Sequence, residues 1–389
     1  MKAGPRTARP GAKPRLFGIG HAAIEPTLGL NARGDIFLTA FESSLRIDVL
    51  RSVDGGRSWN TVSPSLGGQN AHLVSADPYL YVDPRTDRVF TVDLTVACSF
   101  LSYSDDAGGS WTTNPLACGR PVNDHQTLFS GRPLTSTTVG YPRIIYYCFS
   151  DLVNSVCSKS LDGGLSFTPT GEPAFPAGVY PDGGPCPGWH GHGVSAPDGT
   201  IYLPKAHCGR PWLAISNDEG LTWGRVQVSS KGTPRGGSDP AVAVDRAGNV
   251  FYLWISNDRL PYLAVSRDEG LTWSKPLMVG GPGVTEANLP TIAAGRKGAL
   301  AIAYVGSENS LFQQCGNGRP CDHVKPTTPT WNGYITVTSR ALDRRPLLYT
   351  ARVNTFDDPL VRGNCGPGRC SYLLDFIDIQ IDPSGQPWA

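Results

Sequence analysis

The stretch Ser52-Val53-Asp54-Gly55-Gly56-Arg57-Ser58-Trp59 decides how this chain folds, because the sequence repeats its pattern four more times. The pattern is Ser-x-Asp-x-Gly-x-(Ser/Thr)-(Trp/Phe), and we call it the repeat motif. The further copies are Ser104–Trp111, Ser160–Phe167, Ser216–Trp223 and Ser266–Trp273. Their closing aromatic residues lie 52, 56, 56 and 50 residues apart. A recurrence at this interval indicates an array of similar structural units.

Each copy of the repeat motif predicts a hairpin. Apolar residues lead up to the Ser, the Asp and Gly residues form a tight turn, and the aromatic residue begins the returning strand. A calcium loop is the functional alternative, because Asp and Gly recur in such loops. An EF-hand loop also needs a Glu at its twelfth position and flanking helices, which this pattern lacks. We therefore expect the motif to serve the turn.

A second pattern precedes the motif and completes a four-stranded unit. An acidic or polar residue and Pro lead into an apolar strand, a Gly turn and another apolar strand, as at Glu25-Pro26, Asp77-Pro78 and Asp239-Pro240. These units are expected to begin near residues 25, 77, 124, 190, 239 and 288, with a seventh from about 373. A four-stranded meander cannot bury both faces alone, so the units must pack around an axis.

The predicted fold class is therefore all-β, a β-propeller of four-stranded antiparallel blades. Seven blades are expected. The alternative is a six-bladed ring in which residues 373–389 supply a closing strand. Residues 1–20 are expected to form an N-terminal extension, with Arg15 to Ile19 as a candidate closing strand, and residues 21–389 a single domain.

Composition narrows the classes of partner. The 389 residues include 46 Gly and 34 Pro, which punctuate short strands, and only 17% are charged. A net charge of +1 gives no electrostatic reason to expect nucleic acid or an anionic membrane as partner. No apolar run reaches the length of a membrane span. We expect a monomer.

The ten cysteines indicate an oxidising compartment. No Cys-x-x-Cys pair occurs, so a zinc ribbon or thioredoxin-like site has no support. Proximity along the chain suggests five disulfides: Cys98–Cys118, Cys148–Cys157, Cys186–Cys208, Cys315–Cys321 and Cys365–Cys370. Such pairing predicts a secreted, extracellular protein. Residues 1–20 lack the apolar segment of a signal peptide, which is either absent from this chain or already removed.

With five repeat motifs on four-stranded units, the chain resembles the Asp-box, or BNR-repeat, propellers, whose best-known members are sialidases. The resemblance covers about residues 25–389. It implies a propeller with an active site at the channel mouth, a clamp of three arginines, an Asp acid/base and a Tyr nucleophile. Tyr372 lies near the last inner strand, where the family has its Tyr. The family's Arg-Ile-Pro corresponds to Ile24-Glu25-Pro26, so the first clamp arginine is missing.

Equivalent positions of successive units should meet around the mouth of the channel. Their polar residues form the expected ring: Glu25, Asp77, Asp124, His125, His190, His192, Asp239, Glu286, Asn288, Asp375 and Asp378. The loops between the second and third strands would add Glu42, Asp93, Asp151, His207, Asp258 and Glu308. Most of these Asp residues have a structural alternative, the capping of a strand. The histidines depart from the repeat, and Trp189-His190-Gly191-His192-Gly193 is the most unusual stretch.

These residues predict a secreted, sialidase-like glycoside hydrolase acting on extracellular glycans. The candidate catalytic residues are Glu25, Asp77, His125, His192, Asp239 and Tyr372. A carboxylate in place of the clamp arginine would repel an anionic sugar, which favours a neutral glycoside. One alternative is a non-catalytic propeller that binds glycan or protein. Another is a metal enzyme or polysaccharide lyase with a divalent cation at His190, His192 and His207.

Overall fold

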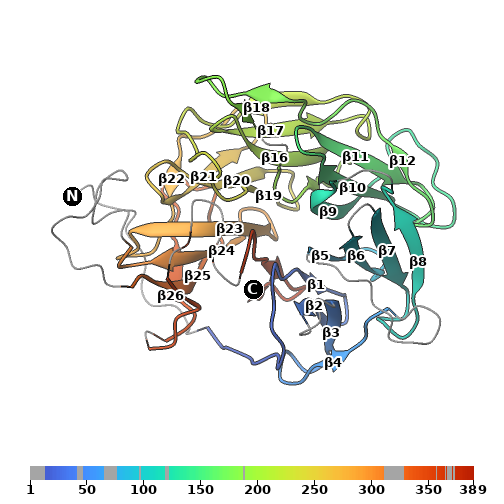
Figure 1. The fold of residues 1–389 in the computed structure, drawn as a ribbon, viewed down its shortest axis with the longest axis horizontal. Helices are drawn as coiled ribbons and strands as arrows, with labels where there is room; N and C mark the ends of the chain where they lie inside the picture. The colour runs from blue at the N-terminus through green and yellow to red at the C-terminus, as the bar shows by residue number, and fades with distance from the viewer. Residues whose placement is uncertain are drawn as a thin grey trace.

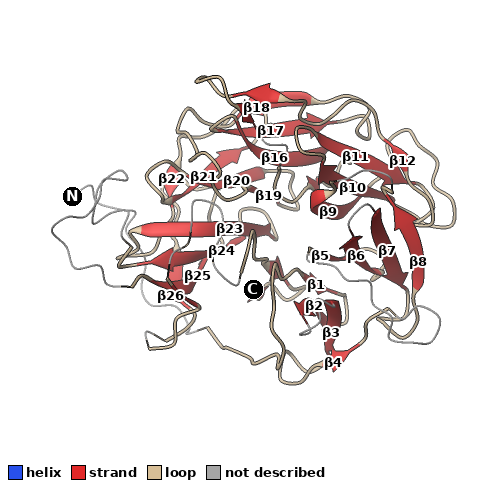
Figure 2. Cartoon of the chain, viewed as in Figure 1, coloured by secondary structure: helices blue, strands red, loops and turns tan. Residues whose placement is uncertain are grey.

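The chain folds into strands, turns and loops with no helix among the described residues (Figure 2). This computed structural model describes residues 14–41, 47–64, 77–95, 98–118, 122–186, 189–310, 328–355, 357–363, 365, 370 and 373–389. Within these ranges no helix is long and apolar enough to cross a lipid bilayer.

Six antiparallel sheets form the body of the molecule, each with its strands side by side in chain order. Blade 1 contains β1 (Leu28–Leu30), β2 (Ile36–Phe41), β3 (Ile47–Ser52) and β4 (Asn60–Thr61). Blade 2 contains β5 (Pro78–Val82), β6 (Val89–Thr95), β7 (Cys98–Ser104) and β8 (Thr112–Leu116). Blade 3 contains β9 (Asp124–Gly131), β10 (Ile144–Ser150), β11 (Ser155–Ser160) and β12 (Thr168–Pro169).

The second half of the ring continues this arrangement. Blade 4 contains β15 (Val194–Ser195), β16 (Ile201–His207), β17 (Arg210–Ser216) and β18 (Gly224–Gln227). Blade 5 contains β19 (Ala241–Val244), β20 (Val250–Ile255), β21 (Pro261–Ser266) and β22 (Leu277–Met278). Blade 6 contains β23 (Glu286–Ala294), β24 (Leu300–Ser307), β25 (Thr330–Thr338) and β26 (Tyr349–Arg352), with β27 (Val361–Arg362) also paired to β25. A small ribbon of β13 (Gly178–Val179) and β14 (Pro185–Cys186) lies on the connection from blade 3 to blade 4.

The blades surround a central axis, with their first strands innermost and their fourth strands at the rim (Figure 1). First strands of successive blades contact one another around the ring. The ring closes through a hairpin of β28 (Gln380–Ile381) and β29 (Pro387–Trp388), because β28 contacts both β1 and β23. The expectation of seven blades is wrong, since this last unit has two strands. The six-bladed alternative, with closure by the C-terminal residues, is confirmed.

The repeat motif fastens the hairpin between the third and fourth strands. In its first copy, Asp54 accepts hydrogen bonds from the backbone N–H of Ser58 at 2.9 Å and from the Ser58 hydroxyl at 2.7 Å. The N–H of Gly56 donates to Ser52 Oγ at 2.9 Å. The same three bonds recur in the other four copies. These hydrogen bonds, chiefly those from Ser58, lower the pKa of Asp54 to about 2. The carboxylates thus serve their own turns.

Apolar side chains fill the space between neighbouring blades and hold the ring together. Tyr252 and Trp254 of β20, for example, share one buried cluster with Tyr202 and Leu213 of blade 4. Removing these faces from water is the main stabilising contribution to such an arrangement.

Four of the five expected disulfides are formed: Cys98–Cys118, Cys148–Cys157, Cys186–Cys208 and Cys365–Cys370. The pair Cys315–Cys321 lies outside the described residues. Residues Arg15 to Ile19 form no strand, contrary to expectation. The segment does not join the two-stranded sheet of the last hairpin. Phe17 instead packs against Trp388, with ring centroids 6.0 Å apart.

Candidate active site at the channel mouth

The mouth is the end of the channel at which the first strand of each blade begins. Four residues at these positions, none of them glycine, have left-handed backbone angles: Glu25 (φ 48°), His125 (φ 53°), Leu289 (φ 50°) and Leu374 (φ 55°). The pairing register of β9 and of β23 is also shifted close to the mouth. Such irregular backbone redirects side chains and is common at functional sites. The expected ring is therefore built on strained strand entrances.

His125 occupies the centre of a group of carboxylates. Its Nδ1 makes a short hydrogen bond with Asp239 of blade 5, and its Nε2 lies 3.5 Å from Asp375 Oδ2. Asp124 Oδ1 is 4.0 Å from Nε2. Burial on its own would lower the pKa of His125, but the charge and hydrogen bond of Asp239 and the hydrogen bond of Asp375 outweigh it and raise the pKa well above the ordinary value. His125 is therefore an imidazolium held between acids.

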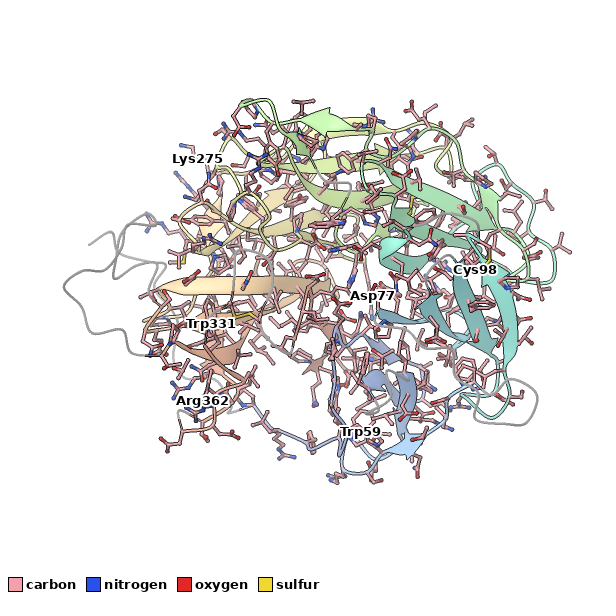
Figure 3. The ribbon with its side chains drawn as sticks, viewed as in Figure 1. Trp59, Asp77, Cys98, Lys275, Trp331 and Arg362 are labelled. Atoms are coloured by element: carbon pink, nitrogen blue, oxygen red, sulfur yellow. A yellow bond between two sulfur atoms is a disulfide. The ribbon has the colours of Figure 1, made fainter. Side chains whose placement is uncertain are left out.

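Glu25 and Asp77 form a second carboxyl pair beside this group. Glu25 is 2% exposed and accepts a hydrogen bond from the N–H of Asp375 at 3.2 Å. Burial, followed by the charges of Asp77 and Asp375, raises the pKa of Glu25 to about 9. Burial and the charge of Asp124 also raise the pKa of Asp77, against the effect of His125 and of a hydrogen bond to Glu25. Two neighbouring carboxyls cannot both ionise easily, so the pair holds a proton at neutral pH. Asp77 lies near the middle of the ring (Figure 3).

His192 packs between two aromatic side chains. Its ring meets Tyr79 of blade 2 edge to face at 4.9 Å and Phe376 of the closing segment at 4.7 Å. Burial and the charge of His125 lower the pKa of His192 to about 3, so its ring is neutral. The structure therefore places His192 as a neutral, buried ring between blade 2 and the closing segment.

The expected metal site is not formed. His190 Nδ1 donates to the carbonyl of Gly191 at 2.8 Å, whereas His207 packs on Phe175 with ring centroids 5.5 Å apart. The part of the chain that the structure describes, which includes His190, His192 and His207, has no group of three or more His, Cys, Asp or Glu side chains able to hold a metal ion. The three imidazoles have different surroundings because His190 and His192 lie before β15, whereas His207 is the last residue of β16.

The comparisons with known proteins concern the fold alone. No protein-family model matches the chain, and neither does any curated protein. Solved structures with a similar fold include the Hadza microbial sialidase Hz136, at 16% identity over 73% of this chain and 63% of the sialidase, with a TM-score of 0.46. The match thus spans less than two thirds of that protein.

Two further solved structures are matched over most of their length. One is an α-L-arabinanase of Penicillium chrysogenum complexed with arabinobiose, with 14% identity, coverage of 90% of this chain and 97% of that one, and a TM-score of 0.44. The other is the Aleuria aurantia lectin in complex with α-methyl-L-fucoside, with 10% identity, coverage of 89% and 100%, and a TM-score of 0.49. Any functional assignment must therefore come from the residues of the mouth.

Several expected ring residues are engaged away from this centre. Asp258 accepts hydrogen bonds from Lys231 and Tyr262 at 2.9 and 2.8 Å, and Glu308 accepts one from Tyr334 at 2.6 Å. Asp378 accepts from the N–H of Leu28 at 2.9 Å and so secures the closing segment. Tyr372 and Glu42 lie outside the described residues.

The repeat alignment did not predict two residues of the mouth region. Trp189 stacks on His125, and in the sequence it stood out only as part of an unusual stretch. Lys205 on β16 is 1% exposed, lies 5.4 Å over the ring of Phe175, and has no hydrogen-bond partner for its Nζ in the described chain. Burial lowers the pKa of Lys205 to about 8. Nothing in the sequence distinguished Lys205 from an ordinary strand residue.

Proposed function

We propose that this protein is a glycoside hydrolase that acts on neutral extracellular glycans at the channel mouth. The observation that carries the proposal is the juxtaposition of two kinds of acid in one enclosed site. The pair of Glu25 and Asp77 keeps a proton, whereas Asp239 shares a short hydrogen bond with the imidazolium of His125. Most glycoside hydrolases use one protonated and one ionised carboxyl group.

In the proposed reaction, Glu25 gives its proton to the glycosidic oxygen as the bond to the anomeric carbon breaks. Asp239 either removes a proton from the attacking water or attacks the anomeric carbon itself, in which case water releases the sugar in a second step. His125 holds Asp239 in place, and although burial raises the pKa of Asp239, the charge and hydrogen bond of His125 act to lower it. Burial keeps Glu25 protonated, together with the charges of Asp77 and Asp375, because all three raise its pKa.

A neutral substrate follows from the same residues. The mouth is lined by carboxylates at Asp77, Asp124 and Asp375, and Glu25 occupies the place where sialidases have an arginine. The negative charges of Asp124 and Asp375 would repel a sugar acid, and the protonated Glu25 supplies no cation to bind one. The four disulfides support an extracellular location.

Turnover by carboxyl variants tests the proposal. The purified protein is assayed against linear neutral oligosaccharides and nitrophenyl glycosides, and product is measured by chromatography. We expect Asp239→Asn and Glu25→Gln to lower kcat by about 100-fold or more, with KM changed by less than about threefold. Asp258→Asn, a carboxylate of the same blade that bonds to Lys231, is the matched control and should retain wild-type turnover. Unchanged kcat in both mouth variants would refute the assignment.

A glycan-binding role without turnover is the second candidate. The exposed indole of Trp189 at the mouth favours it, because an aromatic surface serves binding whether or not a bond is broken. Saturable binding of a glycan with no product from any substrate of the panel would support this role over hydrolysis.

A further inference from the structure

Trp189 presents an open aromatic surface at the mouth. Its side chain is 40% exposed, although large apolar residues are usually covered. The indole lies parallel to the ring of His125, with centroids 5.3 Å apart and an angle of 12° between the planes. One face of the indole is therefore covered by the central histidine, and the exposed area belongs to the rest of the ring.

The contact with His125 also places a positive charge against one face of the indole. His125 is an imidazolium, so the covered face forms a cation–π contact. The carboxylates that surround His125 lie on its other sides. A molecule that rests on the open face of Trp189 therefore lies on the opposite side of the indole from His125 and its carboxylates.

The segment that carries Trp189 is held from both blades beside it. The disulfide Cys186–Cys208 joins it to the end of β16, and the N–H of Gly191 donates to the carbonyl of Pro204 at 3.0 Å. A Cβ atom at Gly191 would clash with the carbonyl oxygen of Pro240, the residue after Asp239. The backbone beside Trp189 therefore packs closely on the segment that carries Asp239 and leads into β19. A platform fixed in this way loses little conformational entropy when a ligand binds.

We propose that Trp189 is a sugar-stacking subsite of the mouth, which binds one pyranose ring of a neutral oligosaccharide on the open face of its indole. The C–H groups on one face of a pyranose carry partial positive charge and match the negative face of an indole. The subsite selects sugars with one face free of axial hydroxyls. This inference rests on the proposed function for the bond that is cleaved, but its binding step is independent of cleavage.

The test measures binding without turnover. In the Asp239→Asn background, neutral gluco-, manno-, galacto- and xylo-oligosaccharides of two to six units are titrated by calorimetry. We expect Trp189→Ala to weaken binding of the best ligand by at least tenfold and Trp189→Phe by less than about threefold. Trp189→Leu, which keeps the bulk and removes the ring, should behave as Trp189→Ala. Leu271→Ala removes another exposed apolar side chain, in the fifth repeat motif, and should not change the affinity.

The outcomes separate this inference from the proposed function. Affinity within twofold of the parent in Trp189→Ala, or no binding of any panel member by the parent, would overturn the subsite. Binding that depends on Trp189 but no product from the wild-type protein would support the subsite and refute hydrolysis. Cleavage with the same KM in the wild type and in Trp189→Ala would support hydrolysis and refute the subsite.

Discussion

At the scale of single residues, the mouth is defined by the proton that Glu25 retains. Its carboxyl group is almost fully buried beside two other acids, yet it accepts a backbone hydrogen bond from Asp375. The folded protein therefore binds this proton more tightly than the unfolded chain does. Such a group links the stability of the fold to pH.

The linkage predicts a pH-dependent effect of Glu25→Gln. The pKa of Glu25 rises from 4.5 to about 9 on folding, so the wild type loses stability as pH rises between these values. The amide cannot ionise. We expect the variant to match the wild type in free energy of unfolding near pH 5 and to exceed it increasingly up to pH 9, as measured by urea unfolding. The exposed Glu269→Gln should follow the wild-type curve, and a constant offset for Glu25→Gln across this range would show that Glu25 holds no proton.

The sequence allowed these residues to be predicted, but not their contacts. Glu25, Asp77, His125 and Asp239 stand at equivalent positions of different units, so the repeat alignment brings them to one mouth. The stacking of Trp189 depends on a loop between blades, which follows no repeat. The same limit applies to His207, which was predicted as a metal ligand. Its ring packs on Phe175, which lies in the connection between blades 3 and 4.

At the scale of elements, the repeat motif stabilises its own turn and also bonds to neighbouring blades, as in the second, third and fifth copies. Glu219, in the fourth copy, is 1% exposed and accepts hydrogen bonds from the N–H groups of Leu134, Thr135 and Ser136 at 2.8 to 3.0 Å. Lys159 Nζ donates to it at 2.8 Å. Burial would raise the pKa of Glu219, but the hydrogen bonds of Lys159 and Ser136 lower it. Glu219 therefore ties blade 4 to blade 3.

A matched pair of variants isolates this tie. Glu219 and Glu269 occupy the same position of successive motifs and share a φ of 61°, but Glu269 is exposed. We expect Glu219→Ala to lower the free energy of unfolding by about 3 kcal/mol, because Lys159 and three N–H groups lose their partner. Glu269→Ala should change it by less than about 0.5 kcal/mol. Both variants are measured by thermal and urea unfolding. If Glu219→Ala and Glu269→Ala lowered the free energy of unfolding equally, the backbone conformation and not the bonds to blade 3 would be responsible. The sequence shows the two residues as equivalent, because only the neighbouring loop distinguishes them.

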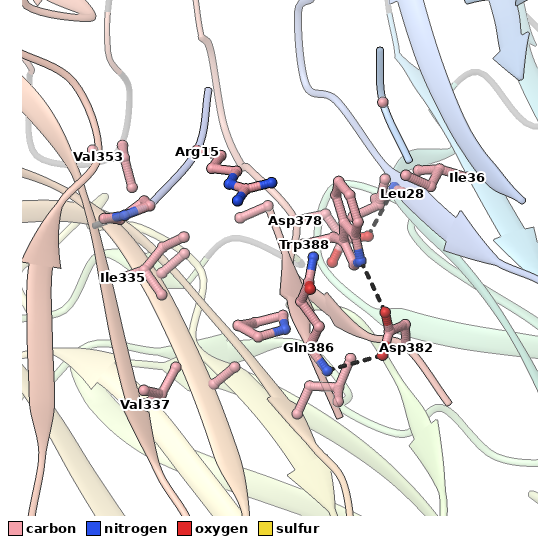
Figure 4. A pocket seen from close by; sticks show the side chains of 18 of the residues that line it. Arg15, Leu28, Ile36, Ile335, Val337, Val353, Asp378, Asp382, Gln386 and Trp388 are labelled. Atoms are coloured by element: carbon pink, nitrogen blue, oxygen red, sulfur yellow. Dashed lines mark hydrogen bonds between the residues drawn. The ribbon is translucent and has the colours of Figure 1, made fainter. Parts of the chain in front are cut away.

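At the scale of the whole molecule, the ring closes through an incomplete unit. The strand count of the last unit could not be read from the sequence, since its first strand resembles the start of any blade. A groove of about 1350 Å³ opens between blade 6 and blade 1, and the hairpin of β28 and β29 also lines it (Figure 4). Ile335, Val337 and Val353 line it on one side, and Leu28 and Ile36 on the other.

Trp388 secures this closure. Its Nε1 donates to Asp382 at 3.3 Å, the N–H of Gln386 donates to the same carboxylate at 2.9 Å, and its ring packs on Phe17. We expect Trp388→Ala to lower the free energy of unfolding by about 1–3 kcal/mol, since a half-buried aromatic contact is lost. Leu16→Ala, 63% exposed in the same segment, is the control and should be neutral. Thermal unfolding that leaves Trp388→Ala unchanged would contradict a role in closure.

The contact between Phe17 and Trp388 also means that the two ends of the described chain lie side by side. A ring of similar units has no structural reason to begin at one blade and not at another. A circularly permuted version, with residues 14 and 389 joined by a short Gly/Ser peptide and new termini opened in an exposed turn between blades, would keep every interface of the ring. The incomplete unit would then lie within the chain and no longer at its end. The order in which the blades are synthesised could be chosen freely.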